Sequence, residues 1–121
     1  MNTAGPDEPI PGTGYALRTV IVAEDLDVLR GPLAGRAQLP LWLDASARRT
    51  YDLTDPHERA LLYEVVLLEA GRPQDLSDWL DGEELVRLWP DLYLPRVVRA
   101  AWQAKHRRLE QAGTGPNVPP L

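Results

Sequence analysis

The sequence predicts a small α+β domain that is mainly α-helical, with a short N-terminal β-hairpin packed on a bundle of about four helices. Three observations lead to this fold class. Leucines alternate with other residues at 39–43, as in extended chain. A capped apolar run at 56–70 is typical of a core helix, and shorter amphipathic runs follow up to residue 111. The 121 residues fit one domain, whose main core we expect between 56 and 110.

The hairpin is expected at about 37–53. Leu39, Leu41 and Leu43 are followed by the small polar turn "DASA" and a second extended run at 49–53. Pro40 cannot donate a ladder hydrogen bond, so the first strand should lie at a sheet edge or turn this proline outward. Further upstream, Val20–Val22 could form a short strand, although the acids that follow also suit a loop or a short helix.

The start of the helix at 56–70 is the clearest local signal. Asp55 is a suitable N-cap, Pro56 suits the first turn, and Glu58 has the spacing of a capping box. The helix should end before Gly71, with Pro73 beyond it. Its apolar residues occupy nearly every side, which predicts either a central core helix or a helix whose second face meets a partner.

Three further helices are expected at 73–80, 82–89 and 95–111, the second of them capped by Asp81 with Glu84 as reciprocal partner. The stretch "LWPDLYLPRVVRAAW" at 88–102 should form the corner between them. Five of its side chains are expected to pack there: Trp89, Tyr93, Leu94, Val98 and Trp102. We expect one domain over 15–111, flanked by disordered tails at 1–14 and 112–121, which are rich in proline and glycine.

Charge is segregated along the chain although its net value is only −5. Residues 73–92 carry six acids and one base, whereas 95–108 carry five bases and no acid. On the predicted last helix, a basic stripe falls within about 100° of arc at 3.6 residues per turn. Its members are Arg96, Arg99, Gln103, His106 and Arg107. The stripe is either a solvated face matched to the acidic segment or the binding site for an acidic protein or nucleic acid, with its arginines pointing outward.

The side-chain inventory predicts that the protein is not an enzyme and holds no metal or cofactor. There are two histidines, no cysteine and no nucleophile or phosphate-loop motif, and the serines are only Ser46 and Ser77. Acids in the first turns of the helices, such as Asp75, complement the helix dipole without a catalytic role. The chain lacks a signal peptide and any run of about 20 apolar residues, so we expect no membrane association and a cytoplasmic location.

The helix-rich pattern at 37–104 resembles a group of small antitoxin-like bacterial proteins encoded beside nucleotidyltransferase-type toxins. Its most specific part is the leucine-tryptophan-proline and Leu-Pro-x-x-Val-Arg-x-Ala-Trp pattern at Leu88–Pro90 and Leu94–Trp102. The matching positions are Trp89, Pro90, Leu94, Pro95, Arg99 and Trp102. The resemblance implies a partner that binds and blocks such a toxin, and it assigns no binding residues.

Two alternatives to this toxin-antitoxin role stay open. The spacing of the last three predicted helices is similar to a helix-turn-helix, so the chain could be a DNA-binding transcriptional regulator. Its middle helix begins with acids, which would repel phosphates, and the basic last helix would therefore have to contact the bases. A structural subunit of a larger complex is also compatible with the pattern, and the sequence leaves the oligomeric state open.

Overall fold

The computed structural model describes residues 20–44 and 50–113, so the predicted tail at 1–14 lies outside the described residues. Five α-helices and one two-stranded antiparallel sheet form this part of the chain, which confirms the predicted α+β, mainly α fold class. In chain order the elements are the 3-10 helix η2 (Leu26–Val28), β1 (Arg36–Ala37), β2 (Tyr51–Asp52), α1 (Pro56–Glu69), α2 (Pro73–Trp79), α3 (Gly82–Leu88), the 3-10 helix η3 (Trp89–Asp91), α4 (Arg96–Lys105) and α5 (Arg107–Ala112).

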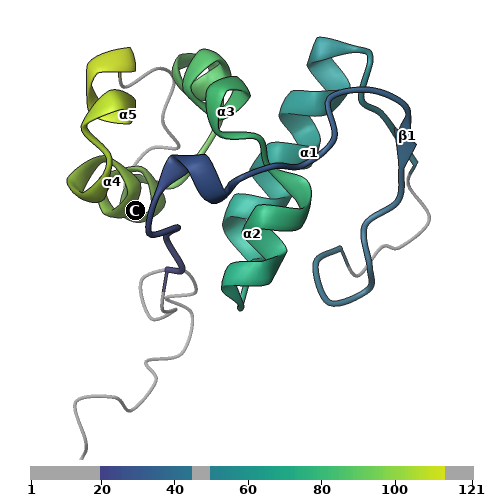
Figure 1. The fold of residues 1–121 in the computed structure, drawn as a ribbon, viewed down its shortest axis with the longest axis horizontal. Helices are drawn as coiled ribbons and strands as arrows, with labels where there is room; N and C mark the ends of the chain where they lie inside the picture. Colours follow the sequence, from purple (N-terminus) through teal and green to yellow (C-terminus); the bar gives the residue numbers. More distant parts are fainter. Residues whose placement is uncertain (1–19, 45–49, 114–121) are drawn as a thin grey trace, which may run out of the picture.

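The helices lie side by side in a row. Figure 1 shows α4 and α5 at one end and β1 at the other, with α1, α2 and α3 between them. The segment from residue 20 to β1 crosses this row of helices. Along its path it is fixed by hydrogen bonds from Arg30 N to Ser77 O (3.3 Å) and from Gly31 N to Leu80 O (2.7 Å). No strand forms at Val20–Val22, so the loop and short-helix alternative is the correct one.

The hairpin is present, but its strands are much shorter than predicted. Arg36 pairs with Asp52 and Ala37 with Tyr51, and the intervening leucines are not in a strand. Pro40 lies in a turn in which its carbonyl accepts hydrogen bonds from Leu43 N (2.9 Å) and Asp44 N (3.0 Å). The prediction of an extended run over 39–43 was therefore wrong, because a proline that cannot donate to a ladder begins a turn here. Most of the predicted "DASA" turn lies outside the described residues.

Helix α1 begins and ends almost where the sequence predicts. Asp55 is the N-cap and its carboxylate accepts a hydrogen bond from His57 N (2.9 Å). The predicted capping box does not form, because the Glu58 carboxylate does not accept from Asp55 N. It accepts from Asp52 N (3.0 Å) and so joins α1 to β2. Asp81 likewise caps α3 through Glu84 N (3.0 Å), while its own N–H donates to the Tyr63 hydroxyl (3.0 Å). The reciprocal bond predicted from Asp81 N to Glu84 is therefore absent as well, and the Glu84 carboxylate instead accepts from Arg59 of α1.

The predicted single helix at 95–111 is interrupted at His106. This residue has an extended backbone conformation, with φ −123° and ψ 102°, and it separates α4 from α5. Its buried imidazole Nε2 lies 2.7 Å from the carbonyl oxygen of Ala23, on the segment that crosses the helices. A contact between residues so far apart in sequence leaves no local pattern, which is why helical periodicity missed the break. Ala112 belongs to α5, so this helix extends into the predicted C-terminal tail at 112–121, and the part of that tail from residue 114 onward lies outside the described residues.

The side chains of the predicted aromatic corner lie at the centre of the core, except that of Tyr93. Trp89, Leu94, Val98 and Trp102 are all buried together with leucines of α1, α2 and α3, as predicted. Tyr93 was wrongly assigned to this corner: its side chain is 58% exposed. The chain around it is extended, so neighbouring side chains point to opposite sides and Leu94 takes the inner position.

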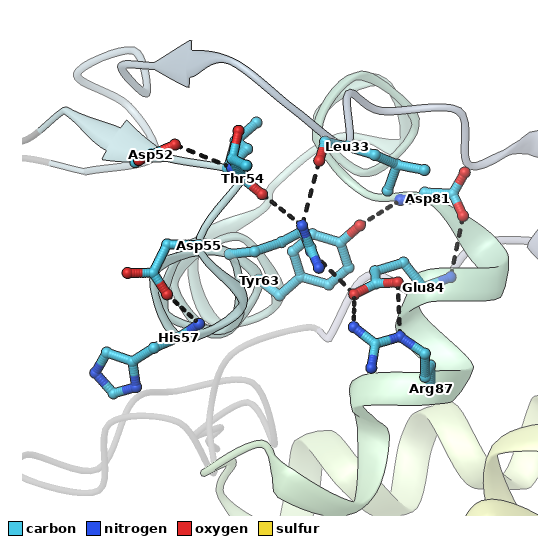
Figure 2. A network of polar contacts seen from close by, with 11 residues as sticks. Leu33, Asp52, Thr54, Asp55, His57, Tyr63, Asp81, Glu84 and Arg87 are labelled. Carbon is cyan, nitrogen blue, oxygen red and sulfur yellow. Dashed lines mark hydrogen bonds and ion pairs between the residues drawn. The ribbon is translucent and has the colours of Figure 1, made fainter.

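A polar network holds α1, α3 and the hairpin together (Figure 2). Arg59 of α1 donates to the carbonyl oxygens of Leu33 and Leu53 and to the Glu84 carboxylate. Glu84 also accepts from Arg87, and the two arginines lower its pKa against the opposing effect of burial. Burial raises the pKa of Tyr63 to about 12, so its hydroxyl remains protonated and accepts from Asp81 N. These contacts set the orientation of α1 relative to α3 and the hairpin.

Candidate partner-binding surface

Arg99, which was predicted to belong to an exposed basic stripe, is inside the protein. Its side chain is 2% exposed and one guanidinium nitrogen, Nη2, donates to the carbonyl oxygens of Trp89 (3.0 Å) and Leu92. The guanidinium carbon lies 5.0 Å from the centre of the Trp89 ring. Burial lowers the pKa of Arg99, and within the described residues it forms no ion pair. The expectation that Arg99 points outward was wrong; this residue joins α4 to the turn around η3.

His106 is also withdrawn from the predicted stripe, because its ring is buried against Trp102 and Ala23. The other three members remain on the surface: Arg96 and Arg107 are exposed and Gln103 is partly exposed. Since α4 ends at Lys105, Arg107 belongs to a different helix from Arg96 and Gln103. The five residues therefore do not form one continuous face.

The acidic and basic segments are in part matched within the chain. Arg108 forms two hydrogen bonds with Glu83 (2.7 and 2.8 Å), and Lys105 lies 3.2 Å from Glu24. The hydrogen bonds and charge of Arg108 lower the pKa of Glu83. Both pairs are solvent-exposed, and exposed pairs contribute little to stability. Among the bases predicted to contact a partner, Arg96 and Arg107 form no ion pair with the described residues.

A different surface combines partly buried apolar side chains of α1 with exposed side chains beside them. At the helical spacing of 100° per residue, Leu61, Val65 and Leu68 fall within about 60° of arc. The centre of this arc is opposite the centre of the buried face, which carries Leu62, Tyr63, Val66 and Leu67. The three outward residues are partly buried hydrophobics packed beside the core. We call this outward face, together with the exposed side chains at its two ends, the α1 surface. Its end residues are Leu41 and Trp42 at one end and Tyr93 at the other.

Trp42 makes two side-chain contacts with α2 and the residue before it, although its side chain is 63% exposed. Its indole Nε1 donates to Asp75 Oδ1 (3.0 Å), and the guanidinium carbon of Arg72 lies 5.2 Å from its ring centre. Asp75 is 2% exposed and also accepts from Arg72 Nη2 (2.8 Å) and Gly71 N (3.3 Å). A buried carboxylate thus fixes the orientation of an exposed aromatic ring. We call Trp42, Asp75 and Arg72 the tryptophan clamp.

The tryptophan clamp stands beside a depression of about 280 Å³. It is lined from the turn by Leu41, Trp42, Leu43 and Asp44, and from α1 by Val65, Leu68 and Glu69. Leu41, next to the clamp, is 67% exposed. An exposed aliphatic and an exposed aromatic side chain beside a hollow lined by α1 form an apolar patch of the kind that partner proteins cover.

The clamp makes stability depend on acid pH. Burial would raise the pKa of Asp75, but hydrogen bonds from Arg72, Trp42 and Gly71 outweigh it, and the pKa lies below the ordinary 3.8. The ionised carboxylate therefore stabilises the fold above about pH 4, and this contribution disappears as pH falls through the lowered pKa. We expect Asp75→Asn to lower the free energy of unfolding by about 1–3 kcal/mol at pH 7 and by much less at pH 3, measured by urea denaturation. An equal loss at both pH values would contradict an ionised clamp.

The other end of the α1 surface is formed by Tyr93 and Glu64. Tyr93 N donates to Glu64 Oε2 (2.8 Å), which ties the extended chain before α4 to the outward side of α1. Burial raises the pKa of Glu64, while the Tyr93 N–H and the charge of His57 lower it. Val97, in the first turn of α4, is a further exposed apolar residue. On the helical wheel Glu64 lies about 40° from Leu68 and about 60° from Leu61, so Tyr93 N contacts the outward side of α1.

Sequence reasoning missed the residues that build this surface, although it contained part of the signal. The interpretation of α1 as a helix with a second, partner-facing side includes Leu61, Val65 and Leu68. Pro40 was the available signal for a turn that exposes Leu41 and Trp42. The hydrogen bond between Trp42 and Asp75 joins residues 33 positions apart, so no local sequence pattern predicts it.

No family model, curated protein or solved structure matches the chain. In residues 20–44 and 50–113, no helix has the length and apolar character needed to span a membrane. In the same two ranges, no group of three or more histidine or acidic side chains could hold a metal ion.

Proposed function

We propose that the chain is a non-enzymatic, cytoplasmic protein-binding module, and that it acts as an antitoxin-like neutraliser of a nucleotidyltransferase-type toxin encoded beside it. The observation that carries the binding role is the tryptophan clamp. An exposed tryptophan whose orientation is fixed before binding loses little side-chain entropy when a partner covers it. Tryptophan, tyrosine and arginine are also the residues that most often dominate binding energy at protein interfaces. The nature of the partner rests on the resemblance at 37–104.

The α1 surface has the composition expected of such an interface. Leu61, Val65 and Leu68 supply apolar side chains from one helix, with Glu64 beside them and the Arg72–Asp75 pair at the Trp42 end. Arg72 is paired with Asp75 and so lowers the charge that a partner would have to desolvate at the Trp42 end. A toxin that binds this face would have part of its own surface covered by the chain. A small protein without catalytic groups can inhibit an enzyme in this way.

The DNA-binding alternative has less support from the described residues. Arg99 and His106 are buried, and Arg108 and Lys105 are paired with carboxylates, which leaves Arg96 and Arg107 as unpaired cations at that end. A protein that binds DNA gains affinity from several phosphate contacts and loses it steeply with salt. Retardation of the promoter DNA at low salt, relieved by Arg96→Ala, would favour this alternative over the protein-binding one.

The proposed function predicts a stoichiometric complex with the toxin encoded by the adjacent gene. Because Trp42 is the preorganised anchor, Trp42→Ala should raise the dissociation constant about 30-fold or more and relieve inhibition of the toxin. Titration calorimetry of the purified proteins measures the first effect and growth on toxin expression the second. Val28→Ala, which removes an exposed apolar side chain on η2, is the control and should bind as the wild type does. Separate elution of the two wild-type proteins, with toxicity unchanged, would rule the proposal out.

A further inference from the structure

Residues 20–31, which we call the strap, cross the row of helices and contact the C-terminal end of α2 (Figure 1). Arg30 N donates to Ser77 O (3.3 Å), and Gly31 N donates to Leu80 O (2.7 Å). The last carbonyl groups of a helix have no partner within it, so the strap supplies donors that α2 itself lacks. These bonds tie the strap to the end of this helix.

The strap and the junction between α2 and α3 approach each other closely at two glycines. A Cβ atom at Gly31 would overlap the backbone of Trp79 and lie 2.6 Å from Leu80 N. From the opposite side, a Cβ atom at Gly82, the first residue of α3, would overlap the carbonyl oxygen of Leu26. The two backbones meet because both residues lack a side chain, so a methyl group at either position would push the strap away.

The strap is flanked by two hollows and has an exposed connection to the hairpin. Its 3-10 helix, η2, borders a depression of about 420 Å³ toward α3 and another of about 300 Å³ toward the junction of α4 and α5. Residues 32–36 are exposed, and Gly35 among them has a φ of +89°, which suits a hinge because glycine adopts it without strain. Segments with few packed neighbours open at a lower free energy than the core.

Opposite charges meet where the strap crosses the junction of α4 and α5. The depression between them is lined by Asp25 and Asp27 of the strap and by three bases within residues 105–108. Lys105 Nζ also lies 3.2 Å from the Glu24 carboxylate. Exposed charge contacts of this kind are weakened by salt. The attraction that holds this end of the strap should therefore fall as the salt concentration rises.

We propose that the strap is a releasable lid, which leaves both junctions as one unit about a hinge at Gly35 while α1 to α5 remain folded, and which opens more readily at high salt. Release breaks the hydrogen bonds to Ser77 and Leu80 and the contact between His106 and Ala23. It uncovers the carbonyl acceptors at the end of α2, so the strap controls access to them. No residue of the α1 surface takes part, and the inference is independent of the proposed function.

Amide hydrogen exchange of the full-length chain, resolved by NMR, tests whether the strap opens on its own. The amides of Arg30, Gly31 and Gly82 donate across the strap junction, so release exposes all three together. Their protection factors should be alike and at least about tenfold lower than those of Leu62 and Val66 in α1. Raising the salt from about 0.05 M to about 1 M should lower the three values about two- to fivefold and leave those of α1 unchanged.

Gly31→Ala and Gly82→Ala should hold the strap open, since each adds a methyl group where the two backbones meet. We expect the remaining amides of the strap junction to lose protection about 100-fold while circular dichroism retains the helical signal. Gly82→Ala does not weaken α3 itself, because alanine is a better helix former than glycine. Gly71→Ala is the matched control: an added Cβ there meets nothing within 4 Å, so protection should not change.

Equal protection of the strap and α1 amides in the wild type would overturn the proposal, since the strap would then open only when the whole domain unfolds. Loss of the helical signal in both Gly31→Ala and Gly82→Ala, or full protection of the strap in both, would do the same. Protection that does not depend on salt would contradict the role of charge in closing the strap.

Discussion

Replacing Trp102 by alanine should lower the free energy of unfolding by about 3–5 kcal/mol, the range for deleting a fully buried large aromatic side chain. Trp102 is 0% exposed and lies on α4 against the buried His106 ring, with ring centres 5.6 Å apart. The alanine would lose the apolar transfer energy of the indole and leave a cavity that the surrounding helices can fill only in part. Urea denaturation followed by far-ultraviolet circular dichroism measures the effect.

Trp42→Ala is the matched control, because it is the same chemical change at an exposed position. We expect a loss of about 1 kcal/mol, from the hydrogen bond to Asp75 and the contact with Arg72. Since small domains are stable by about 5–15 kcal/mol in total, the Trp102 variant should lose a large fraction of its stability and the Trp42 variant only a small one. Similar losses for the two variants would show that Trp102 is not an interior residue.

Arg99→Ala should be a folding mutation and not a binding mutation. The substitution leaves the carbonyl oxygens of Trp89 and Leu92 buried without this donor and opens a cavity beside the Trp89 ring. We expect a loss of about 2–4 kcal/mol in the free energy of unfolding, which combines two buried hydrogen bonds with lost packing. Thermal and urea denaturation measure it.

Arg96→Ala and Arg99→Met separate the contributions to this effect. Arg96 is exposed and unpaired among the described residues, so its loss should change stability by less than about 0.5 kcal/mol. Methionine at position 99 fills much of the volume but donates no hydrogen bond, so the difference from alanine reports packing alone. A fully stable Arg99→Ala with reduced partner binding would instead restore the exposed basic stripe that the sequence predicts.

The parts of the fold that depend on short-range chemistry were predictable. Asp55 before α1, Pro56 at its first position, Gly71 after it and Asp81 before α3 act within one or two turns. These helices begin and end within a residue or so of their predicted limits. The break at His106 and the turn at Pro40 were not predicted, because alternative local structures were compatible with the same residues. The His106 ring is hydrogen-bonded to the carbonyl oxygen of Ala23, 83 residues earlier in the chain. This contact decides between one helix and two.

The candidate site was less predictable because it depends on which way each side chain faces. On the helical wheel Arg99 lies only about 60° from Trp102, at the edge of the apolar side, so periodicity could assign it to either face. The carbonyl acceptors of Trp89 and Leu92 bring it inside. Trp42 is the opposite case: a large aromatic residue predicted in a strand lies in a turn, where buried Asp75 fixes it at the surface.

The most direct test of the account is hydroxyl-radical footprinting of the free chain and of its complex with the adjacent-gene toxin. This measurement reports solvent access to individual tryptophan and tyrosine side chains. In the free chain we predict rapid oxidation of Trp42 and Tyr93 and slow oxidation of Trp89 and Trp102. In the complex, Trp42 and Tyr93 should both be protected. Oxidation of Trp102 as fast as that of Trp42, or a complex in which Trp42 and Tyr93 stay fully reactive, would contradict it.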